Sequence, residues 1–419
     1  MSILRILGIE TSCDETAISL IEVDEAGAHV RVLGNAVHSQ IDVHASYGGV
    51  FPTLAKREHQ RNLVPVLEKV LRQADMLERM NRASATPEKI EAAEAILSRE
   101  PELWESFKAT VPVIARPAID FISVTIGPGL EPALWVGINF ARALATVWDM
   151  PVVPCNHMEG HILAALIQEK AGTFELLERS ISYPAISLLI SGGHTQIVLV
   201  ESIDALRGGI YRIVGETRDD AVGECFDKIA RTLGLAYPGG PKISRLAALA
   251  RKAGIESPEP LPRPMMESGD IDFSFSGLKT AVLYLTRRLS GASGAPLDEA
   301  AMRGIARETE DAITDVLVAK MRKAVERYAV ATLIIGGGVI ANSHIREALE
   351  KLANECSLSI FLPQIDHSTD NGLMIALAGY FGRTKAVSAD TTLAAAGTLA
   401  LGLRAAAEPA AAQKAEKTP

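Results

Sequence analysis

The 419-residue sequence has little of several features that define common protein classes. Its four cysteines lie too far apart to form a Cys-x-x-Cys pair, so neighbouring residues build neither a zinc ribbon nor a dithiol redox site. No uninterrupted apolar run reaches the roughly 18 residues that span a bilayer, and the N-terminus MSILRILGIETS lacks the features of a secretory signal. The formal net charge of −9 excludes a protein that coats nucleic acid by bulk electrostatics. We therefore expect a cytoplasmic protein that does not bind membranes and that holds any nucleic-acid substrate through a local patch or a partner.

The chain has the composition of an ordinary globular protein, with 48% apolar and 22% charged residues. Short β-branched runs bounded by glycine or polar turns predict strands at residues 3–9, 17–23, 121–126, 185–190, 196–200, 332–335 and 359–362. Segments of helical period predict helices at residues 63–74, 141–147, 301–324 and 345–353. Strands that alternate with helices indicate an α/β architecture.

One pattern occurs twice and suggests two related lobes. Residues 6–23 and residues 187–200 each predict a hairpin with a small polar tip. We expect an N-terminal lobe at 1–150 and a second lobe at 151–403, whose chain end can return to the first lobe. A helical addition is expected at about 75–116 and a flexible tail at 404–419, which is poor in large apolar residues.

The segment Asn156–His161 contains a histidine pair that can bind a metal. His157 and His161 lie at i and i+4, so on a helix they project from one face. Asp370, just before an apolar segment, is the expected third ligand, and His367 ranks below it. The ordinary alternatives are two surface histidines without a ligand and an Asp370 that only caps its helix. Glu159 follows His157 by two residues rather than one, so it cannot be the base of an H-E-x-x-H metalloprotease.

Three glycine-rich turns can bring backbone N–H groups close to a phosphate or ribose. They lie at residues 191–195, 237–241 and 336–338. None is a P-loop or a Rossmann fingerprint, so we expect a nucleotide held in a cleft between lobes. Asp14 and Glu15 lie at the first hairpin tip. Asp227 lies on a predicted helix, where it either faces ribose hydroxyls or forms a solvated face with Lys228 or Arg231.

The combined motifs resemble those of one family. They are GIETSCDET at 8–16, SQIDVHASYGGVFPTLAKREH at 39–59, GPGL at 127–130, NHMEGH at 156–161, ISGGHTQ at 190–196, GECFDKIARTLGLAYPGGP at 223–241, FSFSGLKT at 273–280, GGGVIAN at 336–342 and STDNGLMIA at 368–376. In this order they resemble the tRNA N6-adenosine threonylcarbamoyltransferase family, the TsaD type of bacteria, once labelled O-sialoglycoprotein endopeptidases.

This resemblance implies an actin-like ATPase fold of the sugar kinase and Hsp70 type. It implies transfer of a threonylcarbamoyl group from threonylcarbamoyl-AMP to N6 of adenosine 37 in tRNAs that read codons beginning with A. His157, His161 and Asp370 would hold one divalent metal ion, with iron favoured over zinc. The substrate-binding residues would be Leu189, Ile190, Ser191, Gly192, Gly193, Asp227, Gly240 and Asn342. The implied partners are a non-catalytic paralogue of the TsaB type and a small ATPase of the TsaE type.

Some points stay open in the sequence. Asp14 or Glu15 can orient or deprotonate the incoming amine, and the sequence does not choose between them. The segment at 75–116 has no counterpart in the family pattern, and we expect a surface decoration. The acidic net charge predicts weak tRNA binding by the protein alone. The alternative functions are a small-molecule kinase of the same fold and a non-catalytic paralogue, and the ion-binding triad argues against both.

Overall fold

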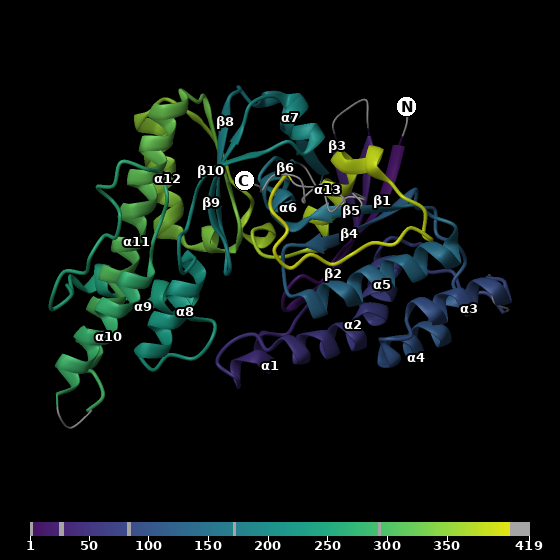
Figure 1. The fold of residues 1–419 in the computed structure, drawn as a ribbon, viewed down its shortest axis with the longest axis horizontal. Coiled ribbons are helices and arrows are strands. Elements are labelled where there is room, and N and C mark those ends of the chain that lie inside the picture. Colours follow the sequence, from purple (N-terminus) through teal and green to yellow (C-terminus); the bar gives the residue numbers. More distant parts are fainter. Residues whose placement is uncertain (1–2, 25–28, 82–84, 171–172, 292–294, 403–419) are drawn as a thin grey trace, which may run out of the picture.

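The computed structural model describes residues 3–24, 29–81, 85–170, 173–291 and 295–402, so the predicted tail at 404–419 lies outside the described residues. Two α/β lobes lie side by side, each built around one sheet (Figure 1). The first sheet has the strand order β5-β4-β1-β2-β3-β7-β6. Its strands are β1 (Ile3–Glu10), β2 (Glu15–Asp24), β3 (His29–Ser39), β4 (Phe121–Gly127), β5 (Val152–Asn156), β6 (Ile167–Lys170) and β7 (Thr173–Leu176).

The second sheet has the order β10-β9-β8-β11-β12. Its strands are β8 (Ala185–Ile190), β9 (Thr195–Val200), β10 (Arg212–Glu216), β11 (Thr332–Gly336) and β12 (Ser359–Phe361). In both sheets three antiparallel strands follow one another, and two parallel strands then continue from the first of the three. This repeated order is that of the actin-like ATPase fold, so the predicted fold class is confirmed.

Thirteen α-helices surround the sheets in the described part of the chain. They are α1 (Ile41–Ala45), α2 (Pro52–Gln73), α3 (Pro87–Ile96), α4 (Pro101–Thr110), α5 (Glu131–Trp148), α6 (His157–Ala164), α7 (Ile203–Gly208), α8 (Val222–Thr232), α9 (Gly239–Ala253), α10 (Ser276–Ser290), α11 (Glu299–Tyr328), α12 (Ser343–Glu355) and α13 (Gly372–Gly382). Among the described residues, every helix is too short or too polar to traverse a lipid bilayer. All of the strands and helices predicted above are present.

Helices α6 and α13 bring the ends of the two sheets together. The apolar helix α13 follows the second sheet but packs on β1, β2, β4 and β5 of the first, and α6 lies between α13 and strands β8 and β11. Glycine permits this close packing, because a Cβ at Gly8 would lie 2.3 Å from the carbonyl oxygen of Gly372. The start of α13 therefore lies directly against β1.

The lobe boundary stays a prediction, and the strand pairing bears on where it falls. The expected division at 150/151 precedes β5, which pairs in parallel with β4, and β6 and β7 also join the first sheet. We propose that the division lies between β7 and β8, because that is where the chain changes sheets.

The segment at 75–116 forms α3 and α4, which pack on α5 and α2. Leu97, Leu103 and Phe107 are fully buried in the core of the first lobe, and the Phe107 ring meets Phe140 edge-on at 6.1 Å. The predicted helical addition is therefore present, its inner face joins the core of the first lobe, and its role stays a prediction. The charge pattern concealed the apolar face that each short helix turns inward.

Candidate metal centre and nucleotide site

The histidine pair lies at the start of α6, directly after β5. Asn156 caps this helix, and its side chain accepts a hydrogen bond from the N–H of Met158 at 2.9 Å. His157 and His161 lie one turn apart with ring centroids 4.7 Å from each other. Both are buried, so the alternative of two surface histidines is wrong.

Asp370 reaches this pair from the turn before α13. Its Oδ1 atom lies 3.5 Å from Nε2 of His157 and 3.2 Å from Nε2 of His161. Asp370 does not cap α13, because Asn371 occupies the cap position and accepts from the N–H of Met374 at 3.0 Å. The carboxylate of Asp370 is therefore available to a ligand.

The three side chains fit a divalent metal ion. One candidate ligand atom from each lies within 4.8 Å of the other two. Nε2 of His161 is buried and, among the described residues, has no hydrogen-bond partner of good geometry. Buried polar atoms normally have a partner, so this nitrogen is free to bind a ligand. Two imidazoles and one carboxylate are a donor set that zinc and iron accept.

Glu10, which the sequence reasoning missed, lies behind His157. It is fully buried, and its Oε2 atom lies 3.1 Å from Nδ1 of His157 and accepts from the hydroxyl of Thr125 at 2.6 Å. Its other oxygen accepts from the N–H of Ser12. A carboxylate only accepts, so Nδ1 carries the proton and Nε2 faces the ligand site. The available signal was an acidic residue at the end of the apolar strand β1.

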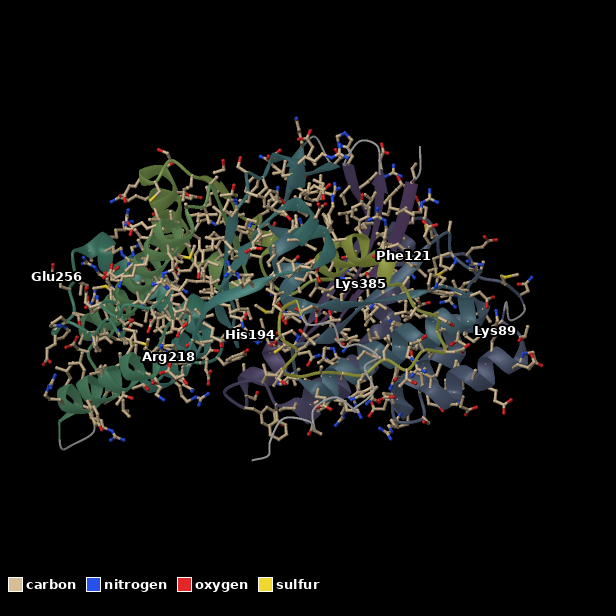
Figure 2. The ribbon with its side chains drawn as sticks, turned by 45° about the horizontal axis from the view of Figure 1, so that its top comes forward. Lys89, Phe121, His194, Arg218, Glu256 and Lys385 are labelled. Carbon is tan, nitrogen blue, oxygen red and sulfur yellow. The ribbon has the colours of Figure 1, made fainter. Side chains whose placement is uncertain are left out.

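In the absence of a metal ion, the carboxylates of the site favour the protonated form of His157, and the histidines favour the ionised form of Asp370. Burial alone would lower the pKa of His157, but Asp370 and Glu10 raise it to about 9. Burial alone would raise the pKa of Asp370, but His157 and His161 lower it to about 2. Burial and the nearby His157 lower the pKa of His194 to about 4. His194 lies where the two lobes meet (Figure 2) and stays neutral at physiological pH.

The tip between β1 and β2 carries Asp14 and Glu15. The carbonyl oxygen of Asp14 accepts from the N–H of Gln40 at 2.9 Å, and its side chain is buried. Burial and the adjacent carboxyl of Asp14 raise the pKa of Glu15 well above its usual value. Glu15 therefore keeps its proton to a higher pH than an exposed glutamate does, and in the protonated form it donates a hydrogen bond.

Two of the glycine turns face open space. Among the described residues, no atom lies within 4 Å of the position that a Cβ would take at Gly192, Gly193 or Gly240. The first turn is braced from behind, because the N–H groups of Gly223 and Glu224 at the start of α8 donate to the carbonyls of Ser191 and Gly192. These turns can therefore admit a ligand without moving.

The remaining predicted binding residues are partly committed within the protein. Asp227 does not pair with Lys228, because Lys228 forms ion pairs with Asp220 and Glu224. The Oδ1 atom of Asp227 instead accepts a hydrogen bond from the N–H of Gly239 at 2.6 Å. Asn342 caps α12 and donates to Oε1 of Glu310 at 2.6 Å. The side chains of Leu189 and Ile190 are fully buried, so only their backbone can line a site.

Two residues near the histidine pair lie outside the metal cluster. The carboxylate of Glu159 accepts from the hydroxyl of Tyr211 at 3.3 Å, so it is engaged elsewhere and is no protease base. His367 stacks edge-on against Phe174 at 5.4 Å and is not part of the group that could hold an ion.

Comparison with known proteins decides the family. The sequence model of the TsaD family, described as tRNA N6-adenosine threonylcarbamoyltransferase, matches residues 31–80 and 112–377. The chain is 40% identical over 376 residues to the protein of that name from Paraburkholderia xenovorans, covering 90% of this chain and 91% of that one. It is also 40% identical to the protein of the same name from Methylobacillus flagellatus, a match that covers 90% of this chain and 92% of that one. The chain belongs to the TsaD family.

The family match skips residues 81–111, which contain α3 and α4. Among solved structures, component A of (R)-2-hydroxyglutaryl-CoA dehydratase from Acidaminococcus fermentans resembles the chain with a TM-score of 0.42 and 14% identity, covering 90% of this chain and 96% of that one. The ROK hexokinase from Thermus thermophilus has a TM-score of 0.39 and 13% identity, covering 91% and 99%. Likeness at this level adds nothing to the fold that the strand order shows.

Proposed function

We infer that this member of the TsaD family transfers the threonylcarbamoyl group from threonylcarbamoyl-AMP to N6 of adenosine 37 in tRNAs that read codons beginning with A. The observation that carries this inference is that a chain of this family keeps His157, His161 and Asp370 within reach of one ion. A small-molecule kinase of the same fold has no need of such a triad, and a non-catalytic paralogue would be expected to lack it.

The triad would hold one divalent metal ion per subunit, with Fe²⁺ favoured and Zn²⁺ as the alternative. When bound, such an ion polarises the transferred carbonyl group or anchors the carbamoyl-threonine. Glu10 would hold the imidazole of His157 so that Nε2 is free of its proton.

The donor is a mixed anhydride, so AMP leaves readily and the protein's task is orientation and stabilisation of charge. The backbone N–H groups of Gly192 and Gly193 would face the phosphate, because the open side of this turn has room for it. The N–H of Ser191 donates to the carbonyl of His194 at 2.9 Å, so Ser191 would contribute its hydroxyl group. Asp227 and the Gly240 turn would hold the ribose. Leu189 and Ile190 through their backbone, and Asn342 at the start of α12, would form the other walls.

Asp14 would orient the adenosine amine and accept its proton, because the raised pKa of Glu15 favours its protonated form, which is not a base. Asp14→Asn should lower kcat at least a hundredfold. Glu15→Gln has the shape of a protonated glutamate and should retain most of the activity, which makes it the matched control. Equal losses in the two variants, measured as kcat, would remove this assignment.

The acidic chain would need partners to hold tRNA. We propose a cytoplasmic complex with a non-catalytic paralogue of the TsaB type and a small ATPase of the TsaE type, because a net charge of −9 provides little general attraction for phosphates. Nanomolar affinity of the protein alone for tRNA at physiological salt would contradict this proposal.

The function is tested by transfer of labelled threonine, with bicarbonate, ATP and the synthase that makes the adenylate, onto tRNA. We expect label in tRNA only when this protein is present with its metal, and none with Asp370→Ala. Labelling that does not depend on the protein, or that persists in Asp370→Ala, would overturn the function or the role of the triad, respectively.

A further inference from the structure

Two aromatic side chains stand exposed on the turn between α1 and α2. Tyr47 is 66% exposed and Phe51 is 53% exposed, and their rings are stacked with centroids 6.0 Å apart. Val43, one turn earlier, is also exposed. Single apolar residues on a surface are common, whereas a stacked pair of rings facing water calls for a partner.

The rings project from a backbone that is fixed from within. His44 is fully buried, and its Nδ1 atom accepts from the N–H of Phe51 at 3.3 Å. Its Nε2 atom lies 3.1 Å from Oε1 of the buried Gln40. The N–H of Tyr47 donates to the carbonyl of His44 at 2.9 Å. The two rings are therefore presented in a set geometry, which reduces the entropy that a ligand must overcome.

This turn lies at the edge of the proposed active site and touches both lobes. Gln40, at the start of α1, is bonded to the backbone of Asp14. On the other side, Nη2 of Arg231 donates to the carbonyl of Gly48 at 2.6 Å. Arg231 lies in the last turn of α8, the helix that carries Asp227, and Figure 1 shows α1 on the side of the first lobe that faces α8. A polymer whose reacting group enters between Asp14 and Asp227 would pass this turn.

We propose that Tyr47 and Phe51 form a stacking platform for unpaired bases of the anticodon loop next to the target adenosine. The proposal rests on the function inferred above. An enzyme that acts on a base must take it out of its stack, and the bases left beside it then need a surface. Proteins recognise unpaired RNA bases by stacking them on aromatic side chains. In an acidic protein this contact would supply affinity that phosphate contacts do not.

The size of the patch favours RNA over a protein partner. An aromatic side chain buries about 150–250 Å² in full, so at the observed exposures the two rings offer roughly 180–300 Å². A stable protein interface needs about 800 Å² on each side. One or two stacked bases, in contrast, match an area of this size.

The first test compares steady-state kinetics of Tyr47→Ala and Phe51→Ala in the assembled transfer system. We expect the KM for tRNA to rise at least fivefold in each, because loss of one stacked base costs about 1–3 kcal/mol, which corresponds to roughly 5- to 150-fold. The KM for threonylcarbamoyl-AMP and the metal content should not change. Tyr47→Phe keeps the aromatic ring, so its KM for tRNA should equal that of the wild-type protein. Tyr284→Ala is the matched control, because Tyr284 lies on α10 of the other lobe and is 62% exposed.

The second test changes the RNA. Binding of an anticodon stem-loop with an abasic nucleotide on either side of the target adenosine is measured separately from transfer, in the same assembled complex. Loss of a neighbouring base should weaken binding to the wild-type protein and have little further effect on Tyr47→Ala.

The outcomes separate the two levels of inference. If the wild-type protein transfers label but the alanine variants keep its KM and stem-loop affinity, the platform is wrong and the function stands. If the variants change the oligomeric mass and not RNA binding, the rings contact protein and the proposal is overturned. If no transfer occurs but stem-loop binding depends on both rings, the platform stands and the reaction is wrong.

Discussion

Replacing Glu10 by glutamine tests whether a buried carboxylate sets the metal-binding form of His157. The N–H of Ser12 is a fixed donor to one oxygen of Glu10, so a glutamine must present its amide oxygen there. Its NH₂ group then occupies the place of Oε2, 3.1 Å from Nδ1 of His157. A protonated Nδ1 would face another donor, so the proton is expected to move to Nε2, the atom that must bind the metal.

The expected loss is close to a hundredfold in metal affinity. Removing a hydrogen-bond partner behind a ligating histidine typically costs 10- to 100-fold, or about 1.4–2.7 kcal/mol. The upper end applies here because Glu10 is fully buried and no water can replace it. The hydroxyl of Ser12, 3.2 Å from the same nitrogen, is the alternative acceptor, so Glu10→Gln combined with Ser12→Ala should lose more.

The assay is competition for Zn²⁺ or, without oxygen, Fe²⁺ between the protein and a calibrated chelator. Thr125→Val is the matched control, because it removes a donor to Glu10 but leaves the contact with His157. Its Kd should stay within about threefold of wild type. In the Zn²⁺-loaded protein labelled with ¹⁵N-histidine, the Nδ1–H signal of His157 should be present in Thr125→Val and lost or displaced in Glu10→Gln. An unchanged Kd in Glu10→Gln would refute the reasoning.

Three further predictions concern the metal centre and the core. His157→Ala should lose the bound metal, measured by elemental analysis of the purified protein, whereas His367→Ala, which removes a histidine outside the cluster, should retain it. Without metal, the pKa of His157 rises on folding from 6.5 to about 9, so its contribution to stability is complete below pH 6.5 and is lost as the pH rises through 9. Denaturant titrations should show the free energy of unfolding fall by roughly 3 kcal/mol over this range. A constant free energy of unfolding across this range would contradict the ion pair. Phe107→Ala should lower the free energy of unfolding by about 3–5 kcal/mol, because the ring is fully buried against Phe140; a change below about 1 kcal/mol would mean that α4 is not part of the core.

The sequence predicted the elements whose own pattern is strong. The apolar runs that became β1, β8 and β11 carry enough β-branched residues to be recognised alone, and the duplicated hairpins pointed to two lobes. The strands that were missed have weaker patterns. β5 contains Pro154, and β3 alternates irregularly with polar residues, so only pairing with neighbours makes them strands.

The sequence by itself also singled out the histidine pair, because two histidines one helical turn apart share a face of the helix. Only the tertiary structure decided that Asp370 rather than His367 lies with the two histidines and that Glu10 contacts His157 from the other side. It also decided that burial and Asp14 raise the pKa of Glu15. These contacts link residues far apart in the chain, and they exist because α13 packs back on the first sheet. The local pattern of apolar and polar residues cannot predict such contacts, because burial and charge pairing arise only when distant segments of the chain pack together.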